Sequence, residues 1–82
     1  MCLAIPGKVI ELYEEDAVTM ARVDFEGIKR SVCLQYVPHA KVGQYVLVHV
    51  GFALNLIDEA EAKRGLALLQ SSGQLEEELA AL

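Results

Sequence analysis

The residues from 17 to 36 alternate between inward and outward positions on either side of a short glycine-containing turn. In residues 17–25 one face of an extended strand carries Ala17, Thr19, Ala21, Val23 and Phe25. Residues 28–36 continue the alternation, with Ile28, Val32 and Leu34 on one face. Glu26-Gly27 suits a two-residue hairpin turn, because glycine readily adopts a positive φ. The pattern predicts an antiparallel β-hairpin with one buried face.

Three further segments are rich in strand-forming residues: 8–13, 44–50 and 52–57. The segment 44–50 is apolar on both alternating faces, so we expect a central strand that is covered on both sides. The acidic residues 14–16 predict a solvated turn rather than a metal site, since three adjacent carboxylates point in different directions. Residues 37–43, which contain Pro38 and Gly43, predict a loop with His39 exposed.

A helix is predicted from Asp58, because aspartate is a favoured N-cap residue. Ala62, Leu66 and Leu69 form an apolar stripe at helical spacing, and Ser71-Ser72-Gly73 ends the helix. Residues 74–82 are able to form a second short helix that would be marginal alone. The expected fold is mainly β, a small OB-like five-stranded barrel with one or two C-terminal helices. We expect a single domain over 1–82, with the barrel and an N-terminal arm in 1–57 and a helical tail in 58–82.

The composition excludes several classes of function. Seven basic against twelve acidic residues give a net charge of −5, which argues against binding to a nucleic-acid backbone. No segment approaches the roughly 18–20 apolar residues that span a bilayer, and no secretory signal pattern is present. Two cysteines are too few for a disulfide scaffold. We therefore expect a cytoplasmic protein with reduced thiols, no nucleic-acid partner and no membrane partner.

The N-terminal segment carries Cys2 directly after Met1 and reaches Pro6-Gly7 soon afterwards. Proline fixes its own φ and favours an extended residue before it, while glycine permits a turn. This pattern predicts a short extended arm that carries Cys2 and hinges at Pro6 and Gly7. If Met1 is removed, the adjacent α-ammonium favours the thiolate, which binds metals and acts as a nucleophile. The alternative is an incidental cysteine in an unstructured terminus.

His49 interrupts the apolar segment 44–50 near its end, and Gly51 follows it. One interpretation is a buried neutral imidazole that needs only a hydrogen-bonded partner. The other is a proton carrier or ligand presented at the end of a strand. Cys33 is interpreted as a small structural residue on the sheet, as free cysteine usually behaves.

Two stretches of the chain resemble a known family. MCLAIPGKV at 1–9 and VGQYVLVHVGFA at 42–53 resemble the two signatures of the HypC/HybG/HupF hydrogenase maturation chaperones, and DEAEA at 58–62 fits the start of their helix. The resemblance extends to about residue 70, and neither signature contains Cys33 or His39. It implies a non-enzymatic chaperone that associates with the iron–sulfur protein HypD. Such proteins escort an Fe(CN)2CO unit to the large-subunit precursor of [NiFe]-hydrogenase.

The same resemblance implies roles for two residues and the removal of Met1. The family's N-terminal cysteine corresponds to Cys2, and its strand-end histidine corresponds to His49. Our hypothesis is that Cys2 contacts the iron unit or a partner's cysteine, a soft-ligand role suited to thiolate. His49 would lie near the base of the arm as a second ligand or hydrogen-bond partner.

Two other functional classes remain open. The first is an adaptor that joins maturation proteins without touching iron. The second is a thiol enzyme with Cys2 as nucleophile and His49 as base, although the sequence shows no third orienting group and no oxyanion loop. A weak nucleic-acid binder of the OB type comes third, because the chain lacks a basic surface and has few aromatic residues.

Overall fold

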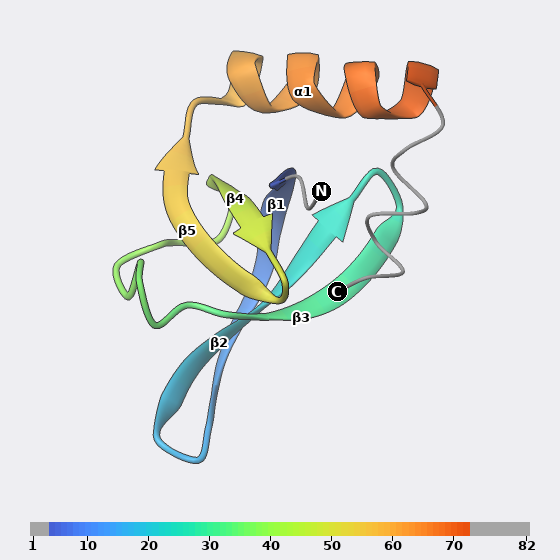
Figure 1. Ribbon diagram of the computed structural model, residues 1–82. Coiled ribbons are helices and arrows are strands. Elements are labelled where there is room, and N and C mark those ends of the chain that lie inside the picture. The colour runs from blue at the N-terminus through green and yellow to red at the C-terminus, as the bar shows by residue number, and fades with distance from the viewer. Residues whose placement is uncertain (1–3, 73–82) are drawn as a thin grey trace.

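The computed structural model describes residues 4–72, in which five strands form a closed barrel followed by one helix (Figure 1). The order around the barrel is β1-β2-β3-β5-β4, and only the β3–β5 contact is parallel. The predicted mainly β, OB-like barrel with a C-terminal helix is confirmed. A second helix at 74–82 lies outside the described residues. The elements are β1 (Ile5–Glu15), β2 (Val18–Phe25), β3 (Ile28–Cys33), β4 (Tyr45–His49), β5 (Phe52–Ile57) and α1 (Glu59–Ser72).

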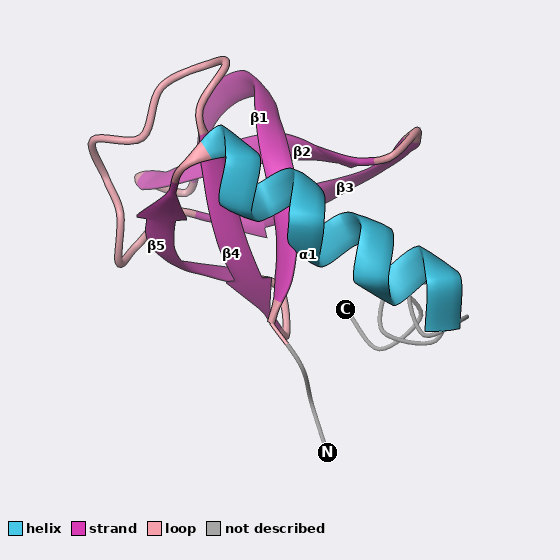
Figure 2. Ribbon diagram, turned by 90° about the horizontal axis from the view of Figure 1, so that it is seen from above, coloured by secondary structure: helices cyan, strands magenta, loops and turns pink. Residues whose placement is uncertain are grey.

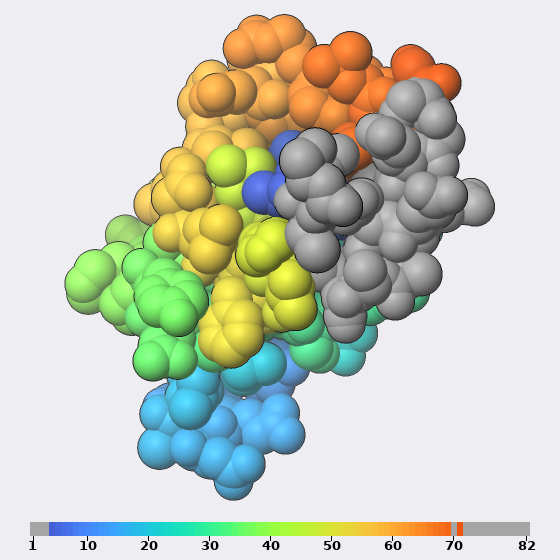
Figure 3. All heavy atoms as spheres, in the orientation of Figure 1, coloured from blue at the N-terminus to red at the C-terminus, as the bar shows by residue number. Residues whose placement is uncertain are grey.

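Three two-residue turns connect the antiparallel neighbours β1–β2, β2–β3 and β4–β5. In each turn both central residues have a positive φ, as type I′ turns require. The hairpin predicted around Glu26-Gly27 is confirmed, with Phe25 opposite Ile28. The Gly27 N–H also donates a hydrogen bond of 2.8 Å to Asp24 Oδ1. The β1–β2 hairpin protrudes from the body of the molecule (Figure 3).

The core lies inside the barrel and extends beneath the helix. The alternation predicted for residues 17–25 is confirmed from Ala21 onward, since Ala21, Val23 and Phe25 are fully buried. Ala17 is exposed in the turn and Thr19 is only partly buried. The residues of α1 that join this core are Leu66 and Leu69. The whole cluster of buried residues comprises Ile5, Val9, Ala21, Val23, Phe25, Val32, Leu34, Ala40, Val46, Val48, Ala53, Leu66 and Leu69.

Helix α1 crosses the outer side of β1 and β4 (Figure 2). Its start agrees with the prediction, because the Ala60 N–H donates to Asp58 Oδ1 at 3.4 Å and the Ala62 N–H donates to the Asp58 carbonyl. The helix approaches β1 closely at Gly65, where an added Cβ would lie 3.0 Å from Pro6 Cγ. Segment 44–50 was expected to be a central strand covered on both sides. β4 lies between β1 and β5, and its inward side chains Val46 and Val48 are fully buried, but its outer face is only partly buried, so the predicted cover on both sides is wrong.

The structure corrects the predicted hinge at Pro6 and Gly7. Both residues are buried within β1, where Pro6 pairs with Leu47 and Gly7 pairs with Val46. Gly7 is needed for space rather than for a bend, because an added Cβ would lie 2.7 Å from Phe25 Cε1. Pairing with β4 on one side and packing against the core keep residues 5–8 extended.

The ends of the other strands also differ from the sequence prediction. β1 continues through the acidic segment to Glu15, so the turn falls at Asp16-Ala17. β3 stops at Cys33 rather than continuing to residue 36. The chain then enters the connection 34–44, in which His39 is exposed as predicted.

Candidate functional site

His49 is the last residue of β4 and lies on the outer face of the barrel. Its neighbour Val48 points into the core and is fully buried, whereas His49 is partly exposed. Within residues 4–72 no hydrogen bond to the imidazole is found. The interpretation of His49 as a buried imidazole satisfied by a partner is therefore corrected. The apolar residues on both sides of His49 predicted a buried side chain, but the outer face of β4 is only partly covered.

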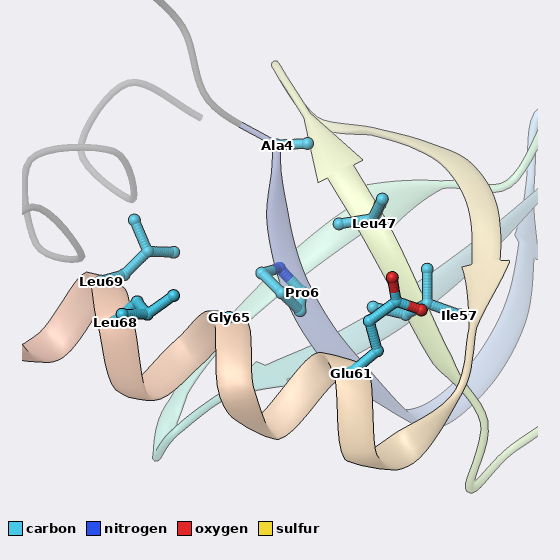
Figure 4. A pocket seen from close by; sticks show the side chains of 8 residues that line it. All are labelled: Ala4, Pro6, Leu47, Ile57, Glu61, Gly65, Leu68 and Leu69. Atoms are coloured by element: carbon cyan, nitrogen blue, oxygen red, sulfur yellow. The ribbon is translucent and has the colours of Figure 1, made fainter.

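The sheet register aligns His49 with residues from three other strands. His49 pairs with Phe52 on β5, and Phe52 pairs with Cys33 on β3. On the other side the ladder between β1 and β4 ends at the pair Ile5–Val48, and Ala4 and His49 are the neighbours of these two residues along the chain. The start of β1 and the end of β4 thus form one edge of the barrel (Figure 4).

The turn that follows His49 contains an unfavourable backbone conformation. Val50 has a φ of 50° and Gly51 a φ of 82°. A β-branched residue at positive φ is an outlier, and such strain concentrates at functional sites. The carbonyl of Gly51 accepts a hydrogen bond of 2.9 Å from the Cys33 N–H, which ties the turn to β3. Gly51 was recognisable from the sequence, but the positive φ of Val50 was not, because it depends on the register between β4 and β5.

Exposed apolar side chains surround this end of β4. Val50 is 54% exposed and Phe52 is 39% exposed. The Tyr36 ring lies against that of Phe52, with 5.8 Å between the ring centroids and a tilt of 50°. Tyr36 itself is 60% exposed. Aromatic residues that combine large apolar area with partial exposure are typical of protein-binding surfaces. Tyr36 was not predicted as a site residue, because its ring contact with Phe52 joins a loop to a strand that is distant in sequence.

A groove of about 390 Å³ separates helix α1 from the strands beneath it (Figure 4). Its lining is apolar apart from the Glu61 carboxylate. The groove begins at Ala4, so it adjoins the point at which the chain enters β1. The residues that line it are Ala4, Pro6, Leu47, Ile57, Glu61, Gly65, Leu68 and Leu69.

The other candidate residues lie in three separate parts of the chain. Cys2 lies outside the described residues. Cys33 is a partly buried free thiol on β3, and His39 is exposed in the connection 34–44. Residues 4–72 contain no group of three or more His, Cys, Asp or Glu side chains arranged to hold a metal ion. Over the same residues, the structure has no helix long and apolar enough to cross a membrane.

Comparison with known proteins identifies the family of this chain. The model of the HupF/HypC family matches residues 1–69. The hydrogenase maturation factor HypC of Synechocystis sp. is 44% identical over 75 residues, which cover 89% of this chain and 99% of that protein. HypC of Azotobacter chroococcum is 46% identical over 77 residues, covering 94% of this chain and 88% of that protein.

A maturation factor with a different name matches at similar identity. HybG of Escherichia coli is 45% identical over 74 residues, which cover 85% of this chain and 89% of HybG. The family resemblance stated from the two sequence signatures is thereby confirmed. The chain belongs to the HupF/HypC family.

Proposed function

We propose that this chain, a hydrogenase maturation chaperone by its family, carries the Fe(CN)2CO unit from HypD to the large-subunit precursor of a [NiFe]-hydrogenase. Cys2 and His49 are the residues that would contact the iron unit or its partner's ligands. The observation that supports this assignment is the register of β1 and β4. The ladder ends at the pair Ile5–Val48, so Ala4, where the described chain begins, and His49 are each one residue beyond its last pair.

Covalent geometry limits how far Cys2 is from this edge. Only Leu3 separates Cys2 from Ala4. Two residues of fully extended chain span at most about 7 Å, so the Cys2 Cα lies within that distance of the Ala4 Cα. Ala4 is in turn bonded to Ile5, which pairs with Val48, the neighbour of His49. A thiol and an imidazole within such reach are able to act on one small ligand.

The chemistry of the two side chains fits an iron unit. Thiolate is a soft ligand, and imidazole binds iron in many proteins. His49 is partly exposed at the end of its strand, and its ring has no hydrogen-bond partner within residues 4–72. A reducing compartment such as the cytoplasm would keep the thiol available. No turnover is required of either residue, so the proposal is a carrier and not an enzyme.

A co-purification experiment tests the proposal. C-terminally tagged wild type, Cys2→Ala and His49→Gln are isolated from cells that make hydrogenase, and His39→Gln serves as the control. His39 is an exposed histidine in the connection 34–44, so its loss removes an imidazole elsewhere. Bound proteins are identified, and infrared spectra are recorded for CN and CO stretches.

We expect wild type and His39→Gln to carry both bands, together with HypD and the precursor. Cys2→Ala should lose the bands, and His49→Gln should weaken them. Bands of equal strength in all four proteins would contradict the roles of Cys2 and His49. The absence of both partners from the wild type would contradict the chaperone cycle itself.

An adaptor that binds maturation proteins without iron is the second candidate. The exposed Tyr36, Val50 and Phe52 side chains favour it, because they offer a protein-binding surface that needs no thiol. In the same experiment, partners retained without CN or CO bands in any variant would support the adaptor.

A further inference from the structure

Phe52 is the residue directly across from His49 on the outer face of the barrel. The two residues flank the turn Val50-Gly51 and pair with each other in the ladder between β4 and β5. Their neighbours Val48 and Ala53 also pair and are fully buried, so His49 and Phe52 both point outward. Cβ atoms of directly opposed residues lie about 4.5–5.5 Å apart, so the phenyl ring and the imidazole are close enough to limit each other's rotamers.

The ring of Phe52 is in turn held by a second ring. β5 lies between β3 and β4 in the barrel, and Tyr36 belongs to the connection that follows β3. The centroids of the Tyr36 and Phe52 rings are 5.8 Å apart, which is within the range that aromatic pairs favour. Phe52 is therefore packed against Tyr36 as well as placed beside His49, and its own rotamers are restricted.

The backbone between His49 and Phe52 is also fixed. Val50 and Gly51 both have a positive φ, and the Gly51 carbonyl accepts a hydrogen bond of 2.9 Å from the Cys33 N–H. The barrel thus sets the direction in which each side chain leaves the strand. What this leaves undetermined is the side-chain torsion of His49, because no hydrogen bond to its imidazole is found within residues 4–72.

The two sides of His49 differ in bulk. β4 lies between β1 and β5. On the β5 side the opposed residue is Phe52, with a phenyl ring. On the β1 side the ladder ends at the pair Ile5–Val48, and Ala4, the residue before Ile5, carries only a methyl group. An outward imidazole therefore meets less bulk when it turns toward the start of β1.

We propose that Phe52 is a positioning residue for His49: its ring turns the imidazole toward the start of β1, and Tyr36 holds that ring in place. The inference rests on the proposed function, because Cys2 belongs to the segment that joins the barrel there. Metal-binding imidazoles are usually oriented by a hydrogen bond from their second nitrogen. Here an apolar contact does the same, and it occupies neither ring nitrogen.

The side-chain conformation of His49 in the free chain tests the inference directly. Three-bond couplings from the His49 Cγ to its backbone nitrogen and carbonyl carbon report the χ1 rotamer. Wild type should show the couplings of a single rotamer, whereas Phe52→Ala should show couplings averaged over several rotamers. Phe52→Tyr keeps a ring of the same shape and should keep the single rotamer.

Further variants separate the ring contact from a general loss of apolar surface. Leu54→Ala removes another exposed apolar side chain from β5 and should leave the His49 couplings unchanged. Tyr36→Leu removes the ring that holds Phe52 and should average the couplings in part. Amide ¹H–¹⁵N spectra check that each variant is folded. If Phe52→Ala does not fold, Phe52→Leu, which keeps apolar volume without a ring, provides the comparison, and averaged couplings are again expected.

The infrared experiment provides the second measurement. Tagged Phe52→Ala from cells that make hydrogenase should retain HypD but carry CN and CO bands about tenfold weaker per bound HypD, as when a metal ligand loses its orienting partner. Phe52→Tyr should restore the bands, and Leu54→Ala should match wild type. If Phe52 served only to bind a partner, HypD and the bands would fall together.

The outcomes separate this inference from the proposed function. A single rotamer in Phe52→Ala, averaged couplings already in wild type, or equal loss of HypD and the bands would overturn the positioning role and leave the carrier function in place. A wild type that carries neither the bands nor its partners would remove the proposed function. The couplings in the free chain would still decide whether Phe52 directs the His49 side chain.

Discussion

Gly7 illustrates how one missing side chain sets the path of β1. A Cβ at this position would meet Val23 Cγ1 and lie 2.7 Å from Phe25 Cε1, both within the core. We expect Gly7→Ala to lower the free energy of unfolding by roughly 1–3 kcal/mol, the usual cost of overpacking. Urea denaturation measures this change.

A double variant provides the control for Gly7. Val23→Ala removes the Cγ1 atom that the new Cβ would meet. Gly7→Ala should therefore cost less in the Val23→Ala background than in the wild type. If Gly7 were a hinge, adding Gly7→Ala would leave the urea midpoint unchanged in each background. That result would contradict the position of Gly7 in a packed strand.

Val50 is the residue at which local backbone preference and observed conformation disagree most. Its φ of 50° suits asparagine, and Asn-Gly is the favoured type I′ pair. Val50→Asn should raise the free energy of unfolding by about 1 kcal/mol, because the strain of a β-branched residue is relieved and little packing is lost. The matched control is Val42→Asn, an exposed valine without a positive φ. A gain of equal size in the control would show that backbone strain at Val50 is not the cause.

At the scale of elements, the docking of α1 depends on Gly65. The helix lies so close to β1 that a Cβ at Gly65 would be 3.0 Å from Cγ of Pro6, a buried residue near the start of that strand. Gly65→Leu should therefore lower the free energy of unfolding by roughly 1–3 kcal/mol, despite leucine's higher helix propensity. Ala67→Leu is the control, because Ala67 is exposed on the same helix. If both variants gain stability, the helix is not held by close contact at Gly65.

The strands and the helix start that could be predicted are those that follow from a local sequence pattern. Alternation identified β2, β5 was predicted with its observed bounds, and the helix start followed from Asp58. The start of β1 was missed, because Pro6-Gly7 is ordinarily a break in a strand. Its extended conformation comes from pairing with β4, about forty residues away in sequence, and from contact with the core.

The candidate site was predictable only in part. The signature resemblance pointed to His49, but the outward direction and partial exposure of its side chain depend on β4's place in the barrel. Tyr36 and Val50 carried no signal in the sequence. Their roles arise from a ring contact with Phe52 and from the register of the β4–β5 turn, and both are products of tertiary structure.

At the scale of the whole molecule, barrel and helix share one core. Leu66 is 3% exposed and belongs to the same buried cluster as Ile5 and Val9 on β1. A barrel of this size buries little apolar surface by itself, so the burial of Leu66 and Leu69 against it adds to the stability of the whole molecule. We therefore expect the helix and the barrel to unfold together in a single transition.

Substitution of Leu66 tests whether the helix and the barrel unfold together. Leu66→Ala should lower the free energy of unfolding by about 2–5 kcal/mol, through lost burial and the cavity left behind. Leu68→Ala, at a position 72% exposed, should change it by less than about 0.5 kcal/mol. Helix content is followed by far-ultraviolet circular dichroism and barrel packing by tyrosine fluorescence, since the chain has three tyrosines and no tryptophan. Coincident urea transitions that shift together in Leu66→Ala are expected. Loss of the helical signal ahead of the tyrosine signal would mean that the barrel stays folded without its helix, and that α1 is free to leave the barrel when a partner binds.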